Sequence, residues 1–64
     1  MEIAADLRAQ AEFKRRLAAT ARRAGATLSR EADRAMMVQR AQELEAEAAG
    51  LEAQADALEN PKSN

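Results

Sequence analysis

The second half of the chain contains the stretch MVQRAQELEAEAAGLEAQADAL, residues 37–58, whose apolar residues recur along one side of a helix. A bulky residue stands at every seventh position, and an alanine follows four places after each of the first three. The stripe consists of Met37, Ala41, Leu44, Ala48, Leu51, Ala55 and Leu58. Two apolar positions in each heptad are typical of a helix that packs lengthwise against another helix. This stretch therefore predicts an α-helix with an interface along its whole length.

The composition favours an all-α protein with few bulky side chains for a core. The chain has 64 residues, and 18 of its 30 apolar residues are alanines. Domains this small usually need disulfides, a metal or oligomerisation to be stable. Because the chain has neither cysteine nor histidine, we expect no metal site and no cofactor. Association with another chain is the remaining route to stability.

The first half of the chain carries a second apolar stripe on a different face. This stripe consists of Ile3, Leu7, Phe13, Leu17, Ala21, Ala24 and Leu28. At about 100° per residue it lies about 150° away from the stripe of the second half. One uninterrupted helix would therefore carry apolar stripes on nearly opposite sides, which favours a break between the two halves.

Glycine and capping residues place the break near Gly25. Gly25 suits the left-handed position just past a helix end, and Ser29 or Thr27 can cap the helix that follows. We predict a two-helix antiparallel hairpin over residues 1–60, with helices at about 2–24 and 30–59, a turn at about 25–29 and a frayed tail at 61–64. One long helix through Gly25 is the alternative, because a helix tolerates a single glycine.

Such a hairpin leaves part of the stripe on its second helix uncovered. A turn at 25–29 pairs residues whose numbers add up to about 54, so that Ile3 lies near Leu51 and nothing in the chain covers Ala55 or Leu58. We expect a second copy to cover them, giving a homodimer and a four-helix bundle joined by a two-fold axis. The interface is expected at the seven stripe residues from Met37 to Leu58.

Charge is distributed unevenly along the sequence. Residues 1–40 contain nine Lys and Arg against five Asp and Glu, whereas residues 41–64 contain one against six. Two hairpins laid head to tail would bring these unlike charges together. An alternative function is nucleic-acid binding by the basic residues near the turn, with phosphate contacts from Lys14, Arg15, Arg16, Arg22 and Arg23. The only aromatic residue, Phe13, belongs to the apolar stripe, so stacking on bases is not expected.

The residue types exclude most enzymatic chemistry. Histidine, cysteine and tyrosine are absent, and the two serines fall in the predicted cap and tail. Nothing offers a nucleophile beside a base, so we predict a non-enzymatic protein without catalytic residues. The N-terminus lacks the basic and apolar segments of a signal peptide, and no apolar run is long enough for a membrane span. We expect a soluble, cytoplasmic protein.

The segment EADRAMMVQRAQELEAEAAGLE, from residue 31 onward, resembles short uncharacterised helical proteins of alphaproteobacteria. Their pattern corresponds here to Asp33, Arg34, Met36, Met37, Ala41, Glu43–Glu45 and Ala48. The resemblance covers about a third of the chain, and Leu44 stands where that pattern has an aromatic residue. It implies a helical fold and brings no activity with it. In size and outline the chain is also similar to two-helix type III secretion chaperones.

The function expected from these observations is a small helical interaction or oligomerisation module with an adaptor or regulatory role. Besides nucleic-acid binding, a second alternative is a chaperone-like or antitoxin-like binder, in which another protein completes the open stripe.

Overall fold

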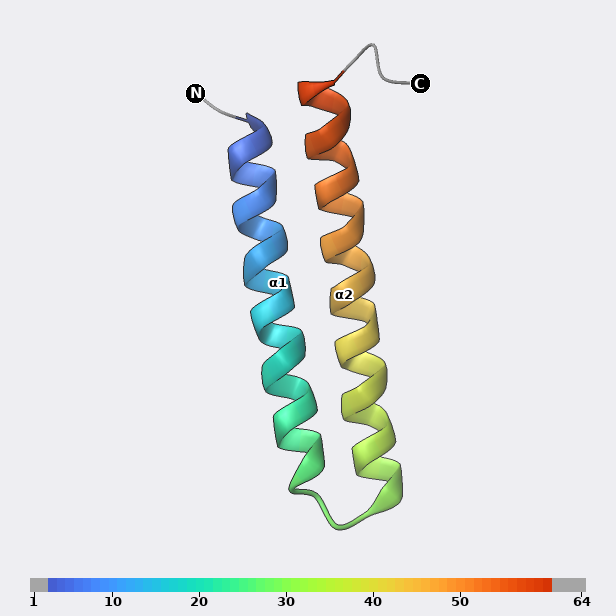
Figure 1. Ribbon diagram of the computed structural model, residues 1–64. Helices are drawn as coiled ribbons and strands as arrows, with labels where there is room; N and C mark the ends of the chain where they lie inside the picture. The colour runs from blue at the N-terminus through green and yellow to red at the C-terminus, as the bar shows by residue number, and fades with distance from the viewer. Residues whose placement is uncertain (1–2, 61–64) are drawn as a thin grey trace.

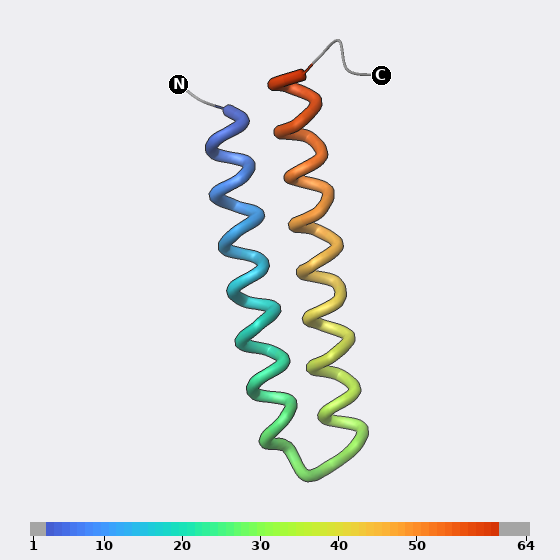
Figure 2. The backbone as a smooth tube through the Cα atoms, viewed as in Figure 1, coloured from blue at the N-terminus to red at the C-terminus, as the bar shows by residue number. Residues whose placement is uncertain are grey.

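The structure is a computed structural model that describes residues 3–60, which form two helices joined by a short turn (Figure 1). Helix α1 spans Ile3–Ala26 and helix α2 spans Glu31–Glu59. The helices run antiparallel and lie side by side from the turn to the open end (Figures 1 and 2). The Cα atoms extend over 49 × 23 × 9 Å, so the hairpin is a single layer of two helices. The predicted all-α antiparallel hairpin is confirmed, and the alternative of one long helix is wrong.

Helix α1 continues past Gly25, which was expected to end it. No described residue has a positive φ, so the prediction of a left-handed glycine is wrong. Gly25 is buried instead, and a Cβ added to it would come within 2.9 Å of the Cβ of Met37. This glycine is needed because the two helices approach closely here, and it plays no part in terminating α1.

The end of α1 is satisfied by local hydrogen bonds. The Thr27 N–H donates to the Ala24 carbonyl at 3.1 Å, and the Thr27 hydroxyl donates to the same oxygen at 2.8 Å. The Leu28 N–H donates to the Gly25 carbonyl, also at 3.1 Å. These bonds take up carbonyl groups that have no partner within the helix.

The start of α2 is held by an arginine in its first turn. Arg30 is the residue before the helix and makes no side-chain capping bond, so the prediction that Ser29 or Thr27 caps α2 is wrong. The guanidinium of Arg34 donates instead to the carbonyls of Leu28 and Ser29, at 3.0 and 2.9 Å. Arg34 thereby ties the turn to α2. The tail predicted at 61–64 lies outside the described residues.

The core between the helices is built almost entirely from small residues. The buried positions of α1 recur every seven residues and are Ala4, Ala11, Ala18 and Gly25. Those of α2 are Ala41, Leu44, Ala48 and Ala55. Leu44 is the only bulky side chain among these described core residues, at 2% exposure. Small residues let two helix backbones approach closely, which gains dispersion contacts from the backbone itself.

Most of the stripe predicted for the first helix does not face α2, although Leu7 and Ala21 are half-buried and Ala21 packs against the core. Ile3 and Phe13 are about three-fifths exposed, and Leu17 and Leu28 are exposed as well. The prediction was wrong because it assigned the bulkiest apolar residues to the interface. The close approach of α1 and α2 selects alanine and glycine there, and turns several bulky residues outward.

The register of the two helices also differs from the predicted one. The cross-helix ion pairs join residues whose numbers add up to between 61 and 67, compared with the expected 54. Helix α1 therefore reaches the open end of α2, where Arg8 pairs with Glu59. Ala55 is completely buried, so the prediction that α1 leaves it uncovered is wrong. Leu58 is 55% exposed.

Candidate association surface

Three arginines of α1 bind carboxylates of α2 at regular intervals along one face of the hairpin. The three arginines are seven residues apart, and so are their glutamate partners, giving the pairs Arg22–Glu45, Arg15–Glu52 and Arg8–Glu59. Asp56 joins the last pair. The residue numbers of each pair add up to 67. We call this set of seven residues the charge ladder.

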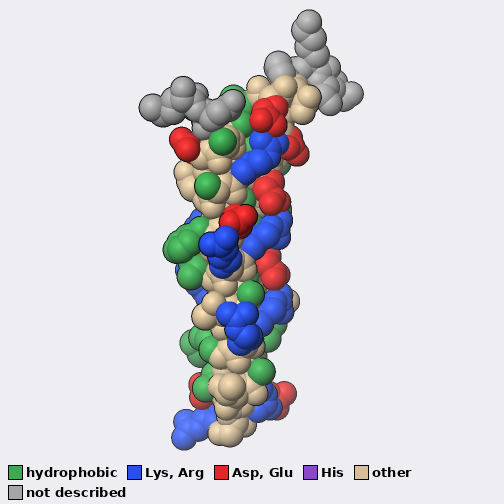
Figure 3. Space-filling view, turned by 60° about the vertical axis from the view of Figure 1, so that its left-hand side comes forward, with side chains coloured by type: hydrophobic (Ala, Val, Ile, Leu, Met, Phe, Trp, Pro, Cys, Tyr) green, Lys and Arg blue, Asp and Glu red, His purple; other side chains and the backbone are tan. Residues whose placement is uncertain are grey.

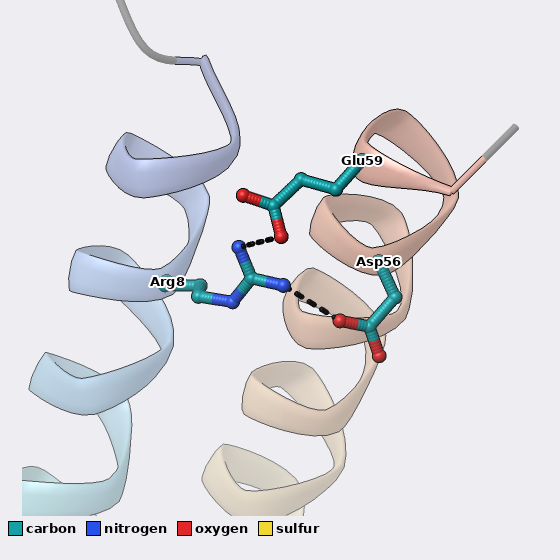
Figure 4. Close-up of polar contacts among 3 residues, drawn as sticks. All are labelled: Arg8, Asp56 and Glu59. Atoms are coloured by element: carbon teal, nitrogen blue, oxygen red, sulfur yellow. Dashed lines mark hydrogen bonds and ion pairs between the residues drawn. The ribbon is translucent and has the colours of Figure 1, made fainter.

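The contacts of the charge ladder use more than one nitrogen of each guanidinium. Arg22 donates from Nε and Nη2 to the two oxygens of Glu45, at 3.2 and 2.7 Å, and Arg15 binds Glu52 in the same way. Arg8 instead bridges two carboxylates, since its Nη2 lies 2.7 Å from Asp56 and its Nη1 lies 2.8 Å from Glu59 (Figure 4). Arginine suits these positions because its planar fork matches carboxylate geometry.

The pKa values of these groups shift in the direction expected for ion pairs. The carboxylate pKa is lowered first by the hydrogen bond from the basic partner, which is Arg22 for Glu45, Lys14 for Glu47 and Arg15 for Glu52. Hydrogen bonds with their carboxylate partners likewise raise the pKa of Arg8, Arg15 and Arg22. All these side chains reach solvent, so the pairs fix the register of the helices more than they stabilise the fold.

The bulky apolar residues of α1 lie on the other side of the hairpin. Successive residues lie about 100° apart around a helix. Each ladder arginine comes four places after a buried alanine, so it lies about 40° to one side of the direction in which that alanine points. Leu17 comes one place before Ala18, and Phe13 comes two places after Ala11. These residues lie about 100° and 160° to the opposite side.

Helix α2 shows the same division into two sides. The ladder glutamates each follow a buried alanine by four places. Leu58 follows Ala55 by three places and Met36 precedes Ala41 by five, which turns them about 60° and 140° the other way. We call the exposed bulky residues of this second side the apolar face, consisting of Ile3, Phe13, Leu17, Met36 and Leu58.

The two sides are visible together when α1 is turned toward the viewer. In Figure 3, Lys and Arg side chains alternate with Asp and Glu down the right-hand side, and hydrophobic side chains protrude on the left. The apolar face also carries charge near its middle, where the Nζ of Lys14 lies 2.8 Å from Glu47. One side of the hairpin thus has its charges paired, and the other exposes apolar surface.

The predicted interface residues occupy the contact between α1 and α2. Ala41, Leu44, Ala48 and Ala55 are buried there, Met37 and Leu51 are half-buried, and Leu58 alone is exposed. Since α1 already covers six of the seven, they offer little surface to a second chain. The exposed apolar surface comes mostly from α1, from stripe residues that were predicted to face α2.

The predicted phosphate-binding residues are for the most part engaged in ion pairs. Lys14, Arg15 and Arg22 bind the α2 carboxylates described above, and Arg16 binds Glu12 one turn away at 2.6 Å. Arg23 donates to the Thr20 hydroxyl at 3.2 Å. The structure therefore does not gather these five residues into one basic patch. Three of them connect the basic helix to the acidic one.

The described residues offer no metal-binding group of three or more His, Cys, Asp or Glu side chains. Neither helix in that part of the chain is long and apolar enough to cross a membrane.

Comparisons with protein-family models, with curated proteins and with solved structures find no match for this chain. The resemblance to alphaproteobacterial helical proteins therefore stays a prediction.

Proposed function

We propose that this chain is a non-enzymatic helical interaction module that self-associates through its apolar face. The observation that carries the proposal is the exposure of several bulky apolar side chains on a hairpin only one helix thick. Phe13, Ile3 and Met36 are each about three-fifths exposed. Large apolar patches on small proteins commonly mark sites of association.

The composition of the core supports association. Seven of the eight buried positions in the helices are alanine or glycine, and Leu44 is the exception. Burial of apolar area is the main favourable term in folding, and seven bulky apolar side chains among the described residues remain 36% to 64% exposed in the hairpin. A partner on the apolar face would bury it and add to the stability of both chains.

The charges of the helices favour a second copy as the partner. Helix α1 contains six basic and two acidic residues, a net charge of +4, whereas α2 contains two basic and eight acidic residues, a net charge of −6. Another hairpin therefore presents a helix of opposite charge to each helix of the first. Complementary charge of this kind orients association and selects the partner.

Sedimentation equilibrium at micromolar concentration tests the proposal. The wild-type chain is expected to show at least twice its mass of 6.9 kDa. Leu17→Glu places a charge on the apolar face and is expected to return the mass to that of one chain. Ala19→Glu makes the same change in charge on the same helix, at an exposed position away from the apolar face, and is expected to leave association intact. A folded wild-type monomer would refute self-association.

The same samples address the alternative of nucleic-acid binding. That alternative needs basic side chains free to meet phosphates, and in the hairpin Lys14, Arg15 and Arg22 bind carboxylates instead. Binding to duplex DNA that weakens steeply with salt would favour the alternative over the proposal. If wild type is a monomer and binds no DNA, the remaining alternative is a chaperone-like or antitoxin-like binder of a different protein.

A further inference from the structure

Lys14 is a charged residue in an otherwise apolar series of α1. The residues seven places before and after it are Leu7 and Ala21, and all three are half-buried. The Nζ of Lys14 lies 2.8 Å from a carboxylate oxygen of Glu47 on α2. The other cross-helix ion pairs among the described residues belong to the charge ladder, which already fixes the register of the hairpin. A single charged residue in an apolar heptad series is a common device for specifying how helices assemble.

Both residues of this ion pair point toward a copy that docks on the apolar side. Lys14 follows the buried Ala11 by three places, and Glu47 precedes the buried Ala48 by one. Their directions are therefore turned about 60° and 100° from the contact between α1 and α2, away from the charge ladder. Leu17 also precedes a buried alanine by one place and is turned by the same angle. The ion pair and Leu17 thus lie on one surface that a partner can cover.

We propose that the Lys14–Glu47 pairs of two copies meet at the centre of a dimer interface, so that each Lys14 lies between the Glu47 of its own chain and that of the other. This inference rests on the proposed self-association and adds the orientation of the two copies. The ion pair lies near the middle of both helices, which span Ile3–Ala26 and Glu31–Glu59. Two hairpins that overlap along their full length therefore bring their ion pairs to the same height.

Charge selects one of two possible two-fold axes for this dimer. An axis parallel to the helices places α1 of each copy on α2 of the other, so that the four charges alternate in sign around the centre. An axis perpendicular to the helices places α1 on α1 and α2 on α2, so that Lys14 meets Lys14 and Glu47 meets Glu47. The net charges of the whole helices, +4 for α1 and −6 for α2, give the same preference. Like charges that face one another across an interface oppose association.

The ion pair orients the two copies more than it strengthens their association. Removing charged groups from water has a cost that their mutual attraction only partly offsets. With the parallel axis, every covered ammonium and carboxylate keeps an opposite charge on both sides. With the perpendicular axis, each would gain a neighbour of like charge instead.

A mixing experiment distinguishes this role from a role within one hairpin. Lys14→Glu gives a chain with two acidic residues at the centre of the interface, and Glu47→Lys gives a chain with two basic residues. Each variant alone is expected to dimerise weakly, because four like charges meet. The mixture is expected to form heterodimers with a dissociation constant at least about tenfold lower than that of either homodimer, measured by fluorescence-detected sedimentation with one chain labelled. If the pair acts only within the hairpin, mixing restores nothing, and that result overturns the inference.

The charge ladder provides the matched control. Arg15→Glu and Glu52→Arg make the equivalent changes in a cross-helix ion pair on the other side of the hairpin. Their mixture is expected to associate no more tightly than either variant alone. An equal gain in affinity for this mixture would show that the chains exchange helices and re-form ion pairs between α1 of one and α2 of the other. That outcome would also overturn the inference.

Cysteines, which the chain lacks, reveal the axis in variants that keep the ion pair. Gln10 and Gln54 are exposed and each precedes a buried alanine by one place, so both point toward the docked copy. Their numbers add up to 64, within the range of the cross-helix ion pairs, so they lie at similar heights. The parallel axis therefore brings Gln10 of one copy opposite Gln54 of the other.

A mixture of Gln10→Cys and Gln54→Cys chains is expected to form mixed disulfide dimers in preference to dimers of either variant alone. Absence of this preference, in chains that still dimerise, overturns the inference while the proposed function stands. Failure of the wild-type chain to dimerise overturns both.

Discussion

Replacement of Leu44 by alanine should remove a substantial part of the stability of the hairpin. Leu44 is the single bulky side chain in the described core, and it contacts Ala18 and Ala41. Removing three buried carbon atoms at about 0.8 kcal/mol each costs about 2.4 kcal/mol. The narrow gap between two exposed helices can close or admit water, so the cavity adds little. We expect a loss of about 2–3 kcal/mol, against a total of about 3–10 kcal/mol for a chain of this length.

Urea unfolding followed by circular dichroism at 222 nm measures this loss. Wild type and variant must be compared at one chain concentration, because association contributes to apparent stability. Val38→Ala is the control, since Val38 is an apolar residue of the same helix that is 39% exposed, and it is expected to change the free energy of unfolding by less than about 0.5 kcal/mol. A loss below about 1 kcal/mol for Leu44→Ala would show that Leu44 does not anchor the core.

Three further predictions concern the close approach of the helices and the charge ladder. Gly25→Ala gains helix propensity but forces a Cβ against Met37. Because the overpacking should cost more than the propensity gains, we expect a net destabilisation of about 1 kcal/mol in urea unfolding; increased stability would refute the close approach. Arg15→Glu should lower the melting temperature and Arg15→Glu/Glu52→Arg should recover most of it at low salt, whereas equal melting temperatures for the two variants would show that the pair does not couple the helices. The pKa values of Glu45, Glu47 and Glu52 are lowered by folding, so these groups stabilise the hairpin above their unfolded pKa of about 4.3 and lose that effect as pH falls through the folded values. The melting temperature should therefore fall between about pH 5 and pH 3, with a shallower fall in Glu52→Gln, and identical pH profiles would contradict this role for Glu52.

The sequence predicted the two helices and their antiparallel order because the signals for them are local. Helix-forming residues run from both sides up to the segment 27–30, and alanine at every seventh position of α2 marks the side that α1 covers. The assignment of Gly25 failed for a physical reason. Glycine serves both at left-handed helix ends and at close helix contacts, and only the position of Met37 distinguishes these roles.

The face of α1 could not be predicted from the bulk of its residues. Hydrophobicity favours Phe13 over Ala11 as the buried residue, but the structure buries Ala11 and exposes Phe13. Packing two backbones closely is a property of the pair of helices, which the sequence of one helix does not reveal. The charge ladder did leave a signal, because arginine recurs at residues 8, 15 and 22 and glutamate at 45, 52 and 59. Matching these two heptad series would have given the correct register.

The charge ladder has a consequence for hairpins that open. Every ion pair of the charge ladder joins α1 to α2, and none joins two residues of the same helix. In an opened chain, α1 can therefore form the same ion pairs with α2 of another opened chain, and the segment 27–30 acts as the hinge. The ion pairs that set the register would then drive domain swapping, in which two chains exchange α2. Each hairpin would be rebuilt from α1 of one chain and α2 of the other.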